Sequence, residues 1–209
     1  MYLSPGGRKA MEKVLRRARG VRTLRDLEEM MRDCHTCSLG DRRTNLVFGE
    51  GDERAEIAFV GEAPGADEDR LGRPFVGMAG QLLTRLIKKM GYERDDVYIA
   101  NVLKCRPPGN RAPLPEEVEV CFPYLAKQLE IIKPKVIVAL GTHAAHLLLG
   151  VKTPITKLRG NLGNYRGMPV MPTFHTAYLL RDRSKSWDVW EDMKKVLEIL
   201  GRSPKTHGD

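Results

Sequence analysis

Short apolar runs alternate with amphipathic helical patterns along most of this chain of 209 residues. Runs of a few apolar residues bounded by glycine, proline and polar residues are typical of buried strands, and longer segments with apolar side chains at helical spacing are typical of helices. The predicted strands are Ile57–Val60, Val97–Val102, Lys135–Leu140 and Pro169–Phe174. The predicted helices are 8–19, 23–33, Met78–Met90, Pro115–Ile132, Gly141–Leu149 and Trp187–Leu200.

This alternation predicts an α/β fold with a parallel sheet flanked by helices, because parallel strands need crossover connections that are usually helical. The length suits one sizeable domain. We expect that domain to span residues 26–200, after a basic N-terminal arm or helix over 1–25 and before a flexible tail over 201–209.

Polar residues stand at the carboxyl ends of the predicted strands, where ligands bind in open parallel sheets. Gly61-Glu62-Ala63 ends the first strand, Asn101 lies near the end of the second, and His175 follows the last. Taken singly, Asn101 reads as a turn former and His175 as a buried core histidine. Their convergence with Glu62 on one rim predicts a functional site.

The loop after the first strand is acidic in a chain whose formal net charge is +8. It holds Glu62, Asp67, Glu68 and Asp69. A solvated acidic turn is the simple explanation, but the prolines and repeated glycines of this long loop favour a functional one. Such acids suit a magnesium-dependent nuclease, whereas Phe75 in the same loop suits stacking of a base. The chain has no glycine-rich dinucleotide or P-loop motif, so no nucleotide cofactor is expected.

The chain has 35 Lys and Arg against 27 Asp and Glu, which favours a polyanionic partner, nucleic acid before an anionic membrane surface. Basic residues gather in the segment 8–25, which reads equally well as a solvated helix or a phosphate-contacting one. The sequence shows neither a signal core nor an apolar run of membrane-spanning length, so we expect a cytoplasmic protein without a membrane partner. Only five Asn and two Gln favour a thermophilic source, although nine Met point the other way.

Four cysteines form one close pair, Cys34 and Cys37, and two distant positions, Cys105 and Cys121. In an intracellular protein, four thiols are typical of metal ligands rather than disulfides. Tetrahedral zinc and a cubane iron–sulfur cluster both take four thiolates, and spacing alone does not separate them, with zinc the commoner choice. Polar, turn-like sequence beside Cys37 and Cys105 argues against four buried, unliganded thiols.

Three segments together resemble family 4 uracil-DNA glycosylases, the iron–sulfur branch of thermophilic bacteria and archaea. They are GEAPGADEDRLGRPFVGMAGQLL, NVLKCRPPGNRAPLPEE and FHTAYLLR, and with the cysteines they follow the family's order from about Cys34 to Trp190. The resemblance implies a three-layer α/β/α sandwich with a four-stranded parallel sheet. It also implies a structural [4Fe-4S] cluster, rather than zinc, on Cys34, Cys37, Cys105 and Cys121.

The implied activity is that of a monofunctional DNA repair enzyme. It flips uracil out of DNA and hydrolyses its N-glycosidic bond, leaving an abasic site for base excision repair, without a divalent metal. Glu62 and His175 are the implied catalytic residues: Glu62 positions water and His175 stabilises the leaving uracil anion. Phe75 stacks on the base, Asn101 reads its edge, and Glu68 helps to exclude the methyl group of thymine. The implied uracil site comprises Gly61, Glu62, Ala63, Glu68, Phe75, Asn101 and His175.

The implied partner is uracil-containing DNA, single- or double-stranded, bound by a monomer. The chain departs from the family at Thr176, where the family usually has proline. Two other classes stay open: a non-catalytic DNA-binding protein that keeps an iron–sulfur or zinc site, and a metal-dependent nuclease that uses the acidic loop. The expected phosphate contacts are Arg16, Arg17, Lys104, Arg106 and Arg181.

Overall fold

A computed structural model describes residues 5–204, with side chains described from residue 11 onward. Six strands form one sheet in the order β1-β3-β2-β4-β6-β5. The four inner strands are parallel, as predicted, and two short antiparallel strands extend the edges. The strands are β1 (Glu50–Gly51), β2 (Ile57–Gly61), β3 (Tyr98–Asn101), β4 (Val136–Leu140), β5 (Gly163–Tyr165) and β6 (Met168–Thr173).

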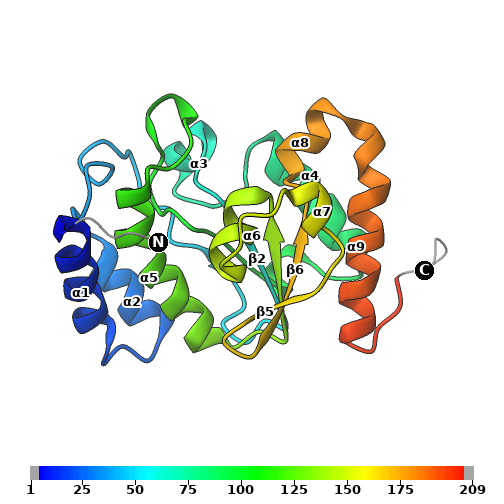
Figure 1. Cartoon of the computed structure of the whole chain (residues 1–209), viewed down its shortest axis with the longest axis horizontal. Helices are drawn as coiled ribbons and strands as arrows, with labels where there is room; N and C mark the ends of the chain where they lie inside the picture. The colour runs from blue at the N-terminus through cyan, green and yellow to red at the C-terminus, as the bar shows by residue number, and fades with distance from the viewer. Residues whose placement is uncertain (1–4, 205–209) are drawn as a thin grey trace.

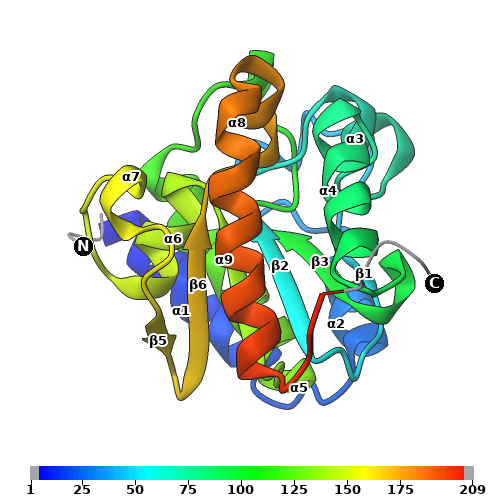
Figure 2. The ribbon, with the colours of Figure 1, turned by 90° about the vertical axis from the view of Figure 1, so that its right-hand side faces the viewer.

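The inner strands are apolar because helices cover both faces of the sheet. Figures 1 and 2 show a layer of α1, α2, α5 and α6 on one face and a layer of α4 and α9 on the other. Alternate side chains of β2 enter two separate cores: Ala58 and Val60 pack toward the first layer, Ile57 and Phe59 toward the second. The structure is therefore the expected α/β/α sandwich. The helices of these layers are α1 (Pro5–Ala18), α2 (Leu24–Met31), α4 (Met78–Lys89), α5 (Pro115–Ile132), α6 (Thr142–Leu149) and α9 (Ser186–Ile199).

The six predicted helices are all present, with ends that differ by at most three residues. The basic N-terminal segment is packed onto the domain, because Val14 and Ala18 of α1 belong to the core that α5 also lines. Of the predicted flexible tail, only residues 201–204 lie within the described part of the chain.

Three short helices and three 3-10 turns were not predicted, because segments of three to six residues carry little periodic signal. One of them, α3, lies inside the acidic segment that the sequence suggested was a loop. Both α3 and α8 follow the carboxyl ends of inner strands, above the sheet in Figure 2. None of the described helices has the length and apolarity needed to cross a membrane. These elements are α3 (Ala66–Leu71), α7 (Ile155–Leu158), α8 (Thr176–Arg181), η1 (Arg94–Asp96), η2 (Pro108–Asn110) and η3 (Arg183–Lys185).

Candidate active site

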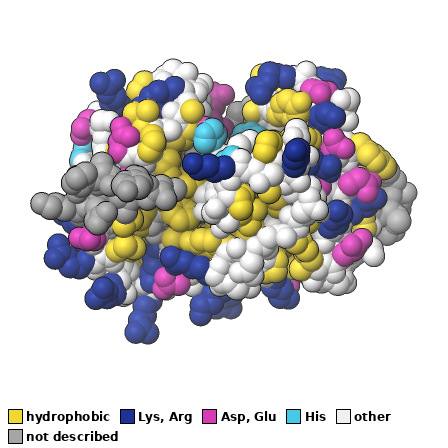
Figure 3. All heavy atoms as spheres, viewed as in Figure 1, with side chains coloured by type: hydrophobic (Ala, Val, Ile, Leu, Met, Phe, Trp, Pro, Cys, Tyr) yellow, Lys and Arg dark blue, Asp and Glu magenta, His cyan; other side chains and the backbone are white. Residues whose placement is uncertain are grey.

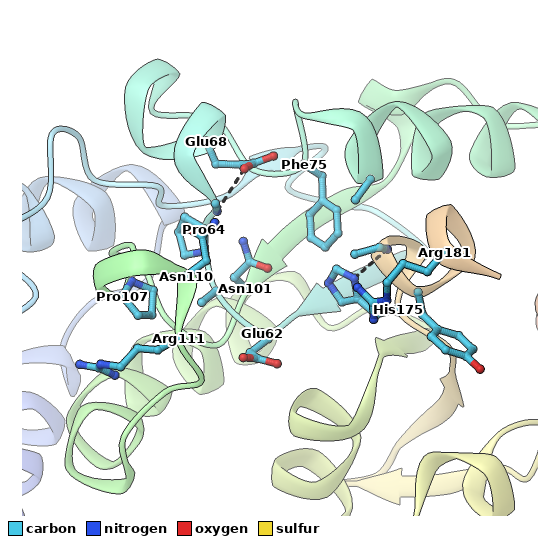
Figure 4. A pocket seen from close by; sticks show the side chains of 15 residues that line it. Glu62, Pro64, Glu68, Phe75, Asn101, Pro107, Asn110, Arg111, His175 and Arg181 are labelled. Atoms are coloured by element: carbon cyan, nitrogen blue, oxygen red, sulfur yellow. Dashed lines mark hydrogen bonds between the residues drawn. The ribbon is translucent and has the colours of Figure 1, made fainter.

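A cavity of about 530 Å³ opens at the carboxyl edge of the sheet and is lined by most of the predicted site residues. In Figure 4, Glu62, Asn101, Phe75 and His175 surround one space, although they come from three strand ends and one loop. Histidine side chains are visible in the hollow between the two upper lobes of the molecule (Figure 3). The predicted residues in the lining are Glu62, Ala63, Glu68, Phe75, Asn101, His175 and Arg181.

Gly61, the last residue of β2, does not line the cavity but lets its walls approach each other. A Cβ atom at Gly61 would lie 2.4 Å from Oδ1 of Asn101 and 2.5 Å from Cζ of Phe75, both far inside van der Waals contact. Phe75 itself has a left-handed backbone, with φ of 51°, and is buried. A Cβ at Gly80 would lie 1.9 Å from the Phe75 carbonyl oxygen. Two glycines thus create the space that the Phe75 turn occupies.

Asn101, the last residue of β3, carries a buried carboxamide. Its Oδ1 has no hydrogen-bond partner in the described part of the chain. A buried acceptor without a donor costs roughly 1–3 kcal/mol. A ligand that brings an N–H group into the cavity recovers that cost.

His175 caps the N-terminus of α8, and this fixes the chemistry of its ring. Its Nδ1 accepts a hydrogen bond of 3.1 Å from the Ala177 N–H, so the neutral ring carries its proton on Nε2. Burial lowers the pKa of His175, with the Arg181 cation acting in the same direction and Glu62 opposing them. The His175 ring also stacks on Phe75, with centroids 5.6 Å apart. The side chain is therefore a neutral, oriented hydrogen-bond donor.

Glu62 follows β2 and keeps a partly exposed carboxylate at the cavity wall. Its Oε2 lies 2.6 Å from Nδ1 of His143, the second residue of α6. This pair raises the pKa of His143, mainly through the hydrogen bond to Glu62. Sequence reasoning assigned no role to His143.

The other acids of this segment are structural. Glu68 accepts hydrogen bonds from the Gly65, Val76 and Gly77 N–H groups, which ties the start of α3 to the Phe75 turn. Asp69 is buried rather than solvated, because its carboxylate accepts from the N–H and the hydroxyl of Thr44. Asp67 is exposed and pairs with Arg70.

Lys104 corrects one sequence expectation. Its side chain is fully buried, and Nζ donates to Oε1 of Gln128 over 2.6 Å, so it cannot contact a phosphate. Burial lowers its pKa to about 7. Arg16, Arg17 and Arg181 are exposed, and Arg106 is half-buried and donates to Asn110.

Sequence reasoning missed one wall of the cavity, formed by Pro107, Asn110 and Arg111. This wall lies opposite Arg181 in Figure 4. Asn110 has a left-handed backbone with φ of 55°, and Arg111 is anchored by the buried Glu117. The second sequence block contains these residues, and the Pro-Pro-Gly-Asn turn was the signal that a structured loop stood there.

All four cysteines line a second, smaller cavity among α2, α5 and the segment after β3. They form no disulfide. Burial raises the pKa of the Cys37, Cys105 and Cys121 thiols, so their thiolates need a compensating positive charge.

Hydrogen-bond donors surround these sulfur atoms. The Lys104 N–H donates to Cys121 Sγ over 3.3 Å, and the Arg43 guanidinium donates to Cys105 Sγ over 3.4 Å. Such donors stabilise metal-bound thiolates and tune iron–sulfur clusters. No three His, Cys, Asp or Glu side chains of the described residues are placed to hold one metal ion. Four thiols in one cavity have the chemistry of a site that is held by thiolates, which both zinc and iron–sulfur clusters accept.

Comparison with known proteins gives one consistent family. Residues 48–200 match the model of the uracil DNA glycosylase superfamily. The chain is 51% identical over 178 residues to the type-4 uracil-DNA glycosylase of Thermotoga maritima. The aligned region covers 83% of this chain and 93% of that protein. It is 43% identical over 194 residues to the type-4 enzyme of Archaeoglobus fulgidus, covering 89% and 98%. A type-5 uracil-DNA glycosylase of Pyrobaculum aerophilum is 36% identical over 147 residues, covering 62% and 64%. The chain belongs to the uracil DNA glycosylase superfamily.

Proposed function

We propose that this chain excises uracil from DNA in the cavity at the carboxyl edge of the sheet. The chain is a uracil-DNA glycosylase, a hydrolase of DNA repair that resembles the type-4 enzymes named above over most of its length. The observation that supports this cavity as the site is the meeting of an unpaired amide at Asn101, an aromatic face at Phe75 and a neutral donor at His175.

Recognition begins when the uracil nucleotide leaves the DNA stack, since the enzyme cannot reach a base inside a duplex. Flipping costs a few kcal/mol, and stacking on Phe75 offsets roughly 1–3 kcal/mol of that. The Asn101 amide accepts from uracil N3–H and donates to O4. Cytosine offers an amino group at C4 and no proton on N3, so it leaves both amide groups mispaired.

Hydrolysis then breaks the C1′–N1 bond. The bonding electron pair stays with uracil, whose negative charge spreads onto O2, and the sugar becomes oxocarbenium-like by analogy with glycoside hydrolysis. The Nε2–H of His175 donates to O2 and stabilises this anion in the manner of an oxyanion hole. Glu62 accepts the proton of the water that adds to C1′. The uracil anion takes up a proton from solvent and Glu62 returns its proton to solvent, so the products are uracil and an abasic sugar. No divalent metal takes part.

The DNA backbone lies along cations on both sides of the cavity and on α1, of which Arg181, Arg16 and Arg17 are exposed and the others half-buried. Arg181 on one side and Arg106 with Arg111 on the other are the residues we assign to phosphate contacts, together with Arg16 and Arg17 of α1. We assign single- and double-stranded DNA as substrates of a monomer.

Cys34, Cys37, Cys105 and Cys121 are the residues that would hold a [4Fe-4S] cluster. A bound cluster would supply a structural cross-link between α2, α5 and the segment after β3, and no redox step. The resemblance to type-4 enzymes supports a cluster over zinc, whereas the N–H donors to Cys105 and Cys121 suit the thiolates of either group.

The test is excision from matched oligonucleotides. The protein is incubated with DNA carrying uracil opposite guanine, opposite adenine or in a single strand, with EDTA present, and abasic sites are counted. The wild type should form abasic sites, and Asn101→Ala should form them far more slowly. Cleavage that EDTA abolishes would instead identify a metal-dependent nuclease, and binding without abasic sites a non-catalytic DNA-binding protein.

A further inference from the structure

The contact between Glu62 and His143 joins the cavity to a helix that otherwise takes no part in it. His143 lies on α6, behind the cavity wall, and is not itself among the lining residues. Its Nδ1 lies 2.6 Å from Oε2 of Glu62. About half of the His143 side chain, 48%, and 31% of the Glu62 side chain are exposed, so neither is needed to fill the core.

The two oxygens of this carboxylate are unequal. Oε2 faces His143, whereas Oε1 has no ion-pair or hydrogen-bond partner among the described residues. An unpaired carboxylate at the end of a Glu side chain would sample several rotamers. The ion pair selects one of them and leaves Oε1 without a partner, on a side chain that lines the cavity.

Resting on the proposed function, we propose that His143 is a positioning residue for uracil excision. It holds Oε2 of Glu62 so that Oε1 is aimed at the water that attacks C1′. This preorganisation matters because reacting groups must be held close to their productive geometry. The water's proton passes to Glu62, and His143 touches neither uracil nor water.

The pair also gives the site a pH dependence whose sign follows from charge. Below the raised pKa of His143, an imidazolium offsets the negative charge of Glu62 and so weakens its pull on the oxocarbenium-like sugar. Above that pKa the neutral ring still contacts Oε2 but no longer offsets the charge. The excision rate should therefore rise with pH through the titration of His143.

Few other charged groups affect the protonation of Glu62 and His143. His175, after β6, is the other titratable group that Glu62 acts on, and its pKa is also shifted by Arg181 of α8 and Glu68 of α3. The pKa of His175 is lowered, whereas that of His143 is raised, so the two histidines change protonation state in different pH ranges. Among the described residues, the charge that raises the pKa of His143 is that of Glu62.

A double-mutant cycle with single-turnover excision of uracil tests the proposal. His143→Ala should slow excision roughly tenfold, less than the roughly 10²–10⁴-fold that a positioned acid–base group itself contributes, because His143 acts only through Glu62. His143→Ala should add nothing further in a Glu62→Gln background, because its effect passes through Glu62. His146→Ala, which removes a histidine one turn along α6 that contacts the Thr153 carbonyl, is the matched control and should leave the rate unchanged.

The pH dependence of the excision rate distinguishes a positioning role from a purely structural one, because a purely structural histidine would not change it. The rise of the rate above about pH 6.5, the ordinary histidine value, should be present in the wild type and absent in His143→Gln. Equal slowing by His143→Ala in both backgrounds, or an unchanged profile in His143→Gln, would overturn the proposal. A wild type that releases no uracil would refute the proposed function instead, and the positioning role with it.

Discussion

Gly61 lies against the Phe75 ring, so close that a methyl group at Gly61 would be 2.5 Å from Phe75 Cζ. The same methyl group would lie 2.4 Å from Oδ1 of Asn101. The backbone of Gly61 does not require glycine, because its φ is not in the left-handed region. Glycine is needed there because the Phe75 ring and the Asn101 amide occupy the space that a side chain at this position would fill.

Gly61→Ala should therefore slow uracil excision by roughly 10²-fold while leaving the protein folded. Either the ring or the amide has to move, and misplacement of about 1 Å near the chemistry can cost roughly 10²-fold in rate. Single-turnover excision measures the loss, and circular dichroism melting checks the fold. Gly20→Ala is the control, because a Cβ atom at Gly20 meets nothing within 4 Å. A Gly61→Ala protein with normal activity would show that Phe75 and Asn101 do not act as the base site.

Asn101→Ala should slow excision roughly 10²–10³-fold, the loss seen when one polar group that stabilises a transition state is removed. Non-specific DNA binding should stay nearly constant, because phosphate contacts supply most of that affinity. The measurement compares the single-turnover rate with the Kd for undamaged DNA. Equal losses in both would mean that Asn101 supports DNA binding rather than reading the base.

The sheet and the rim of the site were predictable because they depend on local pattern. Buried parallel strands are apolar on both faces, so β2 and β4 are visible in the sequence, and their carboxyl ends locate Glu62 at once. The side-chain partners were not predictable. Lys104 is buried because Gln128 meets it from α5, and Asp69 because Thr44 does. Those contacts join residues more than twenty positions apart, which no periodicity records.

The two histidines near Glu62 should titrate on opposite sides of the ordinary histidine value. The pair with Glu62 raises the pKa of His143, whereas burial lowers that of His175. The stabilising contribution of His143 is then fully present below about pH 6.5 and is lost as the pH rises through its folded pKa. The contribution of neutral His175 is present above about pH 6.5 and is lost as the pH falls through its folded pKa.

Proton NMR of the imidazole resonances tests this order, with His143→Gln and His175→Gln to assign the signals. Melting temperatures of the two variants across the same pH range give an independent check. If both imidazoles titrated at the same pH, the ion pair assigned to His143 and the buried position assigned to His175 would be contradicted.

Lys104→Met should leave the salt dependence of DNA binding unchanged, because the buried amine contacts Gln128 and no solvent. Arg106→Gln should lower the slope of log K against log salt by roughly 0.7–0.9, the contribution of one phosphate contact. Binding titrations at several salt concentrations provide both slopes. A reduced slope in Lys104→Met would show that the lysine reaches the surface in the complex.

Each of the four Cys→Ser variants should lose the same bound group and with it part of the stability of the domain. The thiols share one cavity, and three of them are held neutral by burial until a cation compensates their charge. Loss of any ligand separates α2 from α5 and should lower the melting temperature, whereas the apolar core around β2 stays intact. An iron–sulfur protein is brown with broad visible absorption, so absorbance and iron analysis read out loading without any activity assay. A colourless wild type with one zinc per chain would contradict the cluster, and variants that keep the colour would show that the mutated cysteine is not a ligand.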